Sequence, residues 1–124
     1  MATWPERACT ALTVYYERGV RALDYIEREM WDEADSLLSM RTAAFHNFRA
    51  ADYLAQKEGY SAEQDAQLRA IWGQVAANDE KLLAVMMSAR EKLEGEVSRL
   101  AKVSKTLGRF RSGQVQESKW EKPV

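Results

Sequence analysis

The feature that most constrains this chain is the position of its two prolines, Pro5 and Pro123, which leave everything between them free of proline. Proline breaks the interior of a helix because it lacks a backbone donor, whereas the first turn of a helix tolerates it. Apolar residues recur at helical spacing throughout the intervening stretch. We therefore predict an all-α chain built from a few long helices.

The first helix is predicted to begin after Thr3. Thr3 and Glu6 have the spacing of a capping box, in which each side chain satisfies a backbone amide of the other. Gly19 is the one weak position in the helix that follows. Its apolar face is expected to comprise Leu12, Tyr15, Tyr16, Leu23, Ile26 and Met30.

A second helix of similar length is predicted to start at Asp32, which can act as its N-cap. Its apolar residues continue to Gly59, a residue type that commonly ends helices. We expect Phe45 to lie in the core. Two helices of similar length joined by a tight turn form an antiparallel hairpin.

A third helix is predicted from about residue 62 to about residue 110, after a second capping box at Ser61 and Gln64. Its apolar positions recur about every 3.5 residues, the period of coiled coils. The predicted fold is an antiparallel helical hairpin plus a long third helix, a three-helix bundle with a possible short fourth helix or tail. We assign residues 1–111 to a single helical domain and residues 112–124 to a flexible C-terminal tail. The stripe comprises Leu68, Ile71, Val75, Asn78, Leu82, Val85 or Met86, Ala89, Leu93, Val97, Leu100, Val103, Leu107 and Phe110.

The third helix is predicted to be too long for the hairpin to cover. At about 1.5 Å per residue the first two helices reach roughly 38 Å and the third roughly 70 Å. The uncovered apolar edge must be buried by folding back, by dimerisation or by a partner helix. We therefore predict a partner-binding surface formed by Leu93, Val97, Leu100, Val103, Leu107 and Phe110.

Two positions on the third helix leave alternatives open. Asn78 interrupts the apolar stripe, either as a buried amide that fixes helix register or as a partly solvated residue at the edge of the stripe. Met86 and Met87 either fill the core of the hairpin or supply adaptable side chains for binding varied partners.

Composition argues against several classes of function. The 18 basic and 19 acidic residues are intermixed, so a nucleic-acid partner is not expected. The chain has one cysteine, Cys9, one histidine, His46, and no glycine-rich phosphate loop, so we expect no enzyme, cofactor or metal site. Without a long apolar run or a signal peptide, no membrane insertion is expected, and a cytoplasmic location is favoured.

Several short motifs follow one another in a characteristic order along the chain. They are a helix ending just before Trp31-Asp32, then Asn78-Asp79, Leu82-Leu83, Arg90, Leu93 and the run Lys105-Thr106-Leu107-Gly108-Arg109-Phe110. In this order, residues 12–112 resemble the flagellar type III export chaperones of the FliT and FlgN group. The length of the chain and its short tail favour the FliT type.

This resemblance implies a cytoplasmic helical chaperone that masks the polymerising helix of a flagellar subunit before export. A FliT-type chaperone serves the filament cap protein and also contacts the export ATPase and the flagellar master regulator, whereas the FlgN type serves the hook-filament junction (hook-associated) proteins. The group also implies a C-terminal segment that shields the client site, and Trp120 is the candidate residue for such a lid. The alternative is a helical adaptor that forms a homodimer or binds a regulator through the third helix.

Overall fold

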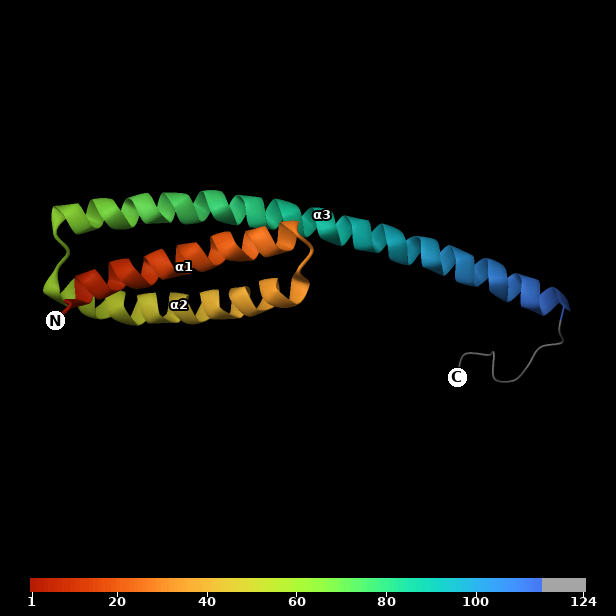
Figure 1. Cartoon of the computed structure of the whole chain (residues 1–124), viewed down its shortest axis with the longest axis horizontal. Coiled ribbons are helices and arrows are strands. Elements are labelled where there is room, and N and C mark those ends of the chain that lie inside the picture. Colours follow the sequence, from red (N-terminus) through yellow and green to blue (C-terminus); the bar gives the residue numbers. More distant parts are fainter. Residues whose placement is uncertain (115–124) are drawn as a thin grey trace. The chain divides into compact units, whose positions relative to one another are not determined.

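The computed structural model describes the backbone of residues 1–114 and the side chains of residues 1–105. Three helices, α1 (Trp4–Glu27), α2 (Trp31–Glu58) and α3 (Ala62–Gln114), make up this part of the chain, which contains no strand (Figure 1). The predicted all-α class is confirmed. The helices have 24, 28 and 53 residues, so the predicted mismatch in length is also confirmed.

Local side-chain caps set two of the helix starts, as predicted. The Glu6 amide donates a hydrogen bond to the Thr3 hydroxyl, and the Thr3 amide donates one to the Glu6 carboxylate. Both donor–acceptor distances are 3.3 Å. Ser61 and Gln64 repeat this arrangement at the start of α3, with distances of 2.9 and 3.1 Å. Gly59 ends α2 with a φ of 89°, a conformation that costs glycine little, and its amide bonds to the Ala55 carbonyl.

The start of α2 differs from the prediction. Its N-cap is Met30, which makes no side-chain cap, and Asp32 lies in the first turn of the helix. The turn before it is closed by backbone bonds, and Glu29 adopts a left-handed φ of 57°. Backbone geometry thus starts α2 at Trp31, one residue ahead of the predicted cap. Asp32 still stabilises the start of α2, because its negative charge interacts favourably with the positive end of the helix dipole.

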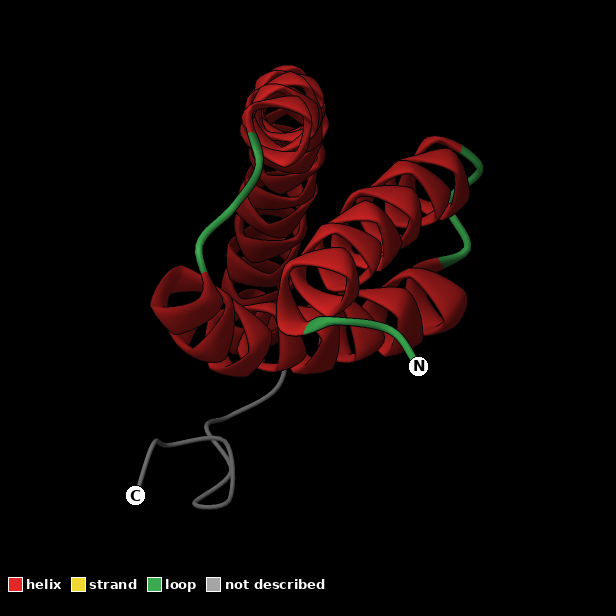
Figure 2. Cartoon of the chain, turned by 90° about the vertical axis from the view of Figure 1, so that its left-hand side faces the viewer, coloured by secondary structure: helices red, strands yellow, loops and turns green. Residues whose placement is uncertain are grey.

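The chain divides after Met86 into two compact units. In residues 1–86, α1, α2 and the first part of α3 pack side by side, and successive helices run in opposite directions (Figure 1). Seen along the bundle, the three helices form a triangle instead of a flat layer (Figure 2). This arrangement buries one face of each helix in a shared core, as expected for a three-helix bundle.

The core of this unit consists of two separate apolar clusters. The first contains Ala8, Cys9, Leu12, Phe48, Ala51, Ala55, Leu68, Ile71 and Val75. The second contains Ala22, Ile26, Ala34, Leu37 and Leu82. All three helices contribute to both clusters. Five of these 14 residues are alanines, which lets the helix backbones approach closely.

The expectation that Phe45 is a core residue is wrong. Phe48 is the phenylalanine buried in the first cluster, whereas Phe45 is half-buried and packs edge-on against Tyr15, with 5.4 Å between ring centroids. Leu82, also predicted to be in the core, is 4% exposed. The two phenylalanines are three residues apart and therefore lie on neighbouring parts of one face of α2.

The second unit begins at Met87, and α3 continues in it to Gln114. Residues 112–114, which the sequence assigned to the tail, are therefore helical. The predicted boundary at residue 112 otherwise stays a prediction, since residues 115–124 lie outside the described part of the chain.

Candidate functional site

A layer of polar residues separates the two apolar clusters. It is formed by Tyr15 and Gly19 of α1, Arg41 of α2, and Asn78 and Asp79 of α3, and we call it the central polar layer. On each helix these residues lie between the residues of the first cluster and those of the second. Arg41 of α2 and Asn78 and Asp79 of α3 thus interrupt the apolar positions of their helices at one level of the bundle, next to Gly19 of α1.

Arg41 is the centre of this layer. Its guanidinium donates a hydrogen bond to the Asp79 carboxylate and lies 4.4 Å from the centroid of the Tyr15 ring. The Arg41 side chain is 17% exposed and the Asp79 side chain 46%, so the ion pair is partly shielded from water. The Arg41 Nε atom is buried and has no hydrogen-bond partner. Burial raises the pKa of Tyr15, and Asp79 raises it further, while Arg41 lowers it.

Gly19 leaves the space that the polar side chains occupy. A Cβ atom at this position would lie 2.9 Å from Asn78 Nδ2 and 3.2 Å from Arg41 Nε. Both distances are shorter than ordinary van der Waals contact. A side chain at position 19 would therefore displace Asn78 or Arg41 from the positions that they occupy beside glycine.

Asn78 is the one buried polar residue among those described, at 8% exposure. The alternative of a partly solvated amide at the edge of the stripe therefore does not apply. A buried amide beside a partly buried ion pair favours one alignment of the helices, because sliding α3 by a turn would place apolar side chains against Arg41. We interpret Asn78 as part of a layer that fixes register.

The described part of the predicted partner-binding surface is exposed. Leu93, Val97, Leu100 and Val103, which we call the outer stripe, are 61, 58, 68 and 56% exposed. Within residues 62–105 of α3 the last buried side chain is Leu82. The apolar repeat of α3 therefore continues past the point where its side chains are covered.

The structure describes the other predicted site residues to different extents. Leu107 and Phe110 lie on the helical backbone of α3, but their side chains are outside the described residues. Trp120, the candidate lid residue, lies wholly outside them. Met86 and Met87 are 45 and 53% exposed, so neither fills the core of the bundle.

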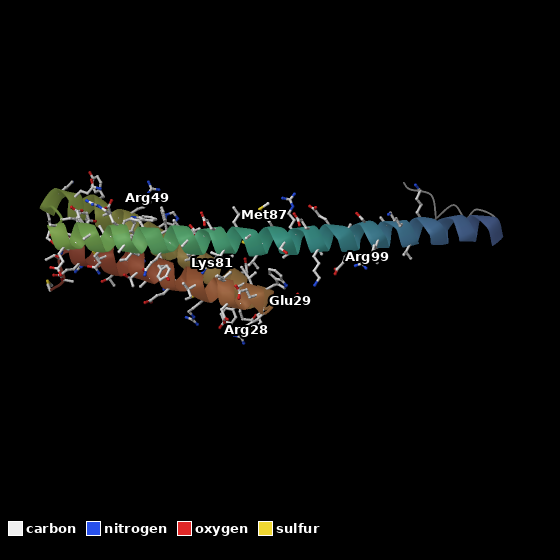
Figure 3. All side chains as sticks on the ribbon, turned by 90° about the horizontal axis from the view of Figure 1, so that it is seen from above. Arg28, Glu29, Arg49, Lys81, Met87 and Arg99 are labelled. Carbon is white, nitrogen blue, oxygen red and sulfur yellow. The ribbon has the colours of Figure 1, made fainter. Side chains whose placement is uncertain are left out.

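A basic segment beside the outer stripe was missed when charge was counted over the whole chain. Residues 97–116 contain five basic residues and no acidic one. Three of the five, Arg99, Lys102 and Lys105, have described side chains, and all three are exposed; Figure 3 labels Arg99 on α3. A charge count by segment would have revealed this pattern.

Neither a metal-binding group nor a membrane-spanning helix is found in the described part of the chain. No group of three or more histidine, cysteine, aspartate or glutamate side chains is placed to hold a metal ion among the described residues. No helix in the same part of the chain is long and apolar enough to cross a membrane. Cys9 is buried in the first apolar cluster, and burial raises the pKa of its thiol, which makes it a poor nucleophile.

Comparison with protein families, curated proteins and solved structures finds no match to this chain.

Proposed function

We propose that this chain is a cytoplasmic flagellar export chaperone that binds and masks the polymerising helical segment of a flagellar subunit before type III secretion. The filament cap protein is the first client we propose. The proposal combines the resemblance of residues 12–112 to the FliT and FlgN group with the exposure of the outer stripe.

The outer stripe is the observation that carries the proposal. Four leucine and valine side chains recur along one face of a helix, and each is more than half exposed. Full burial of such a side chain contributes about 1.5 to 3 kcal/mol, so covering all four would favour a complex by several kcal/mol before the cost of association. A helix with its own apolar face fits this surface because both have the same spacing.

The first unit has a packed core of its own, separate from this surface. In residues 1–86 the first part of α3 is held by two apolar clusters and the central polar layer. A binding surface that works by shape and apolar area requires no catalytic group. Masking a client helix is consistent with these features.

The test is calorimetric titration of the full chain with purified clients. The filament cap protein and each hook-filament junction protein are titrated separately, with a globular flagellar protein that lacks a free helical terminus as the control. We expect saturable binding of the cap protein alone. Binding of the junction proteins alone would indicate the FlgN type, and binding of none of them would refute the proposal.

A further inference from the structure

We infer that the helix bound by the outer stripe is acidic, with carboxylates beside its apolar face. This inference rests on the proposed function and adds the charge of the partner to it. It comes from the charges of Arg99, Lys102 and Lys105 around Leu100 and Val103, of which the motifs of the resemblance include only Lys105.

Basic residues surround the second half of the outer stripe. Arg99, Lys102 and Lys105 are exposed and lie within five residues of Leu100. No acidic residue occurs between Glu96 and Glu117. Charges this close to a docked helix fall within the Debye length, about 8 Å at physiological salt, so they act on any charge that the partner carries. An acidic partner is attracted and a basic one repelled.

A second copy of this chain fits the surface poorly. Two copies that pair in parallel through Leu100 bring Arg99, Lys102 and Lys105 of one copy beside the same residues of the other, and an antiparallel pair still brings Arg99 and Lys102 of the two copies together, with Lys105 near Glu94 and Glu96. Like charges at a helix interface destabilise the pair and select against it. The charge pattern therefore favours a different protein with the opposite charge.

An anionic lipid surface also fits less well than a helix. Glu94 and Glu96 lie between Leu93 and Val97 in the sequence, and Glu96 is half-buried on α3. Their carboxylates would face anionic headgroups if the whole stripe lay on a membrane. The described stripe also contains only leucine and valine, without the aromatic residues that are common in helices at membrane surfaces.

The experiment uses the full chain and three synthetic amphipathic peptides of about 21 residues, or about six helical turns. All three peptides have the same leucine and valine positions, and their polar positions carry glutamate, glutamine or lysine. Fluorescence anisotropy of each labelled peptide is measured at low and high salt. We expect the glutamate peptide to bind at least about tenfold more tightly than the glutamine peptide at low salt, with the difference shrinking as salt rises.

Two triple variants locate the effect. Arg99→Gln with Lys102→Gln and Lys105→Gln should remove the preference for the glutamate peptide and leave binding of the glutamine peptide unchanged. The matched control, Arg21→Gln with Arg69→Gln and Lys81→Gln, changes the net charge equally at exposed positions of residues 1–86 and should keep the preference. Equal loss in both variants would mean that net charge alone is responsible, which would overturn the inference.

The remaining outcomes separate this inference from the proposed function. Equal affinity for all three peptides would overturn the acidic preference while leaving helix binding intact. No binding of any peptide, together with no binding of the flagellar clients, would refute both. Cosedimentation with phosphatidylglycerol vesicles that the glutamate peptide does not reverse would overturn the inference in favour of a membrane. A dimer in sedimentation velocity that Leu100→Asp dissociates would overturn it in favour of self-association.

Discussion

Arg41 of α2 pairs with Asp79 of α3 at the level where the apolar core of the bundle is interrupted. The two residues are 38 positions apart in the sequence, and the pair lies beside the buried Asn78. A partly buried ion pair contributes more to the alignment of helices than to net stability, because desolvation offsets much of its attraction.

A double-mutant cycle tests this interpretation of the pair. Asp79→Asn leaves the Arg41 charge without its partner and should lower the free energy of unfolding by about 1 to 2 kcal/mol, less than for a fully buried pair because Asp79 is 46% exposed. Arg41→Met removes the charge and the unpartnered Nε. Urea unfolding of both single variants and the double variant should give a coupling energy of about 0.5 to 2 kcal/mol. Simple additivity would show that the pair does not couple α2 to α3.

Gly19→Ala should destabilise the bundle, although alanine is the better helix former by about 1 kcal/mol. The added Cβ would lie 2.9 Å from Asn78 Nδ2 and 3.2 Å from Arg41 Nε, so we expect a net loss of about 1 to 2 kcal/mol. Gly73→Ala is the matched control, because a Cβ there has nothing within 4 Å, and it should stabilise by up to about 1 kcal/mol. Thermal melts that rise for both variants would refute the proposed role of Gly19.

Adjacent leucines on α3 test the assignment of the core face. Leu82 is 4% exposed and Leu83 is 61% exposed. Leu82→Ala should lower the free energy of unfolding by about 2 to 5 kcal/mol because it leaves a cavity in the second apolar cluster. Leu83→Ala should change it by less than about 0.5 kcal/mol. Denaturant titrations that give the two variants similar losses would mean that α3 is rotated from its assigned position.

Tyr60 should make the bundle sensitive to alkaline pH. Its hydroxyl donates a hydrogen bond to an Asp52 carboxylate oxygen, with a distance of 2.6 Å between the two oxygens. Burial is the largest cause that raises the pKa of Tyr60 well above the usual value, and this hydrogen bond is the next. The folded state therefore keeps a proton that the unfolded chain loses. The resulting stability is present below about pH 10 and is lost as pH rises further.

Melting temperatures between about pH 8 and pH 11 test this expectation for Tyr60. Tyr60→Phe should lower the melting temperature near neutral pH and flatten its decline at high pH. Tyr53→Phe, at a position 65% exposed, should leave the whole profile unchanged. An equally steep decline in Tyr60→Phe would assign the alkaline sensitivity to other groups.

Local sequence patterns predicted the parts of the fold that depend on neighbouring residues. The capping boxes at Thr3 and Ser61 involve residues three apart, so the sequence displays both partners together. The N-cap of α2 was assigned wrongly because backbone bonds, and not the Asp32 side chain, close that turn. Phe45 was assigned to the core because helical spacing identifies the apolar face of α2 but not which residues of that face are the most deeply buried.

The central polar layer could not be predicted in full because its contacts link different helices. Asn78 stood out as a polar residue within an apolar stripe, and Gly19 as a weak helix position. Nothing local indicates that the two residues meet or that Arg41 lies between them. The outer stripe, in contrast, followed from the unequal helix lengths alone, and the four residues with described side chains are exposed as that mismatch predicts.

The central claim is that the outer stripe binds a client without being part of the folded core. Calorimetric binding of the filament cap protein to Leu100→Asp, with Ser98→Asp as the matched control, tests it most directly. Both substitutions add one negative charge to an exposed position of the same helix, but only Leu100 belongs to the stripe. A charge buried in an apolar interface costs several kcal/mol, whereas a charge left in water costs little.

We expect Leu100→Asp to abolish binding of the cap protein. Its circular dichroism spectrum should match that of wild type, and its melting temperature should stay within a degree or so of the wild-type value. For comparison, a 1 kcal/mol loss of stability would lower the melting temperature by roughly 4 °C. Ser98→Asp should keep binding the cap protein, with no more than the small loss of affinity that one added negative charge causes beside an acidic client helix. Full binding by Leu100→Asp, or its unfolding, would contradict the claim that the outer stripe is a client-binding surface.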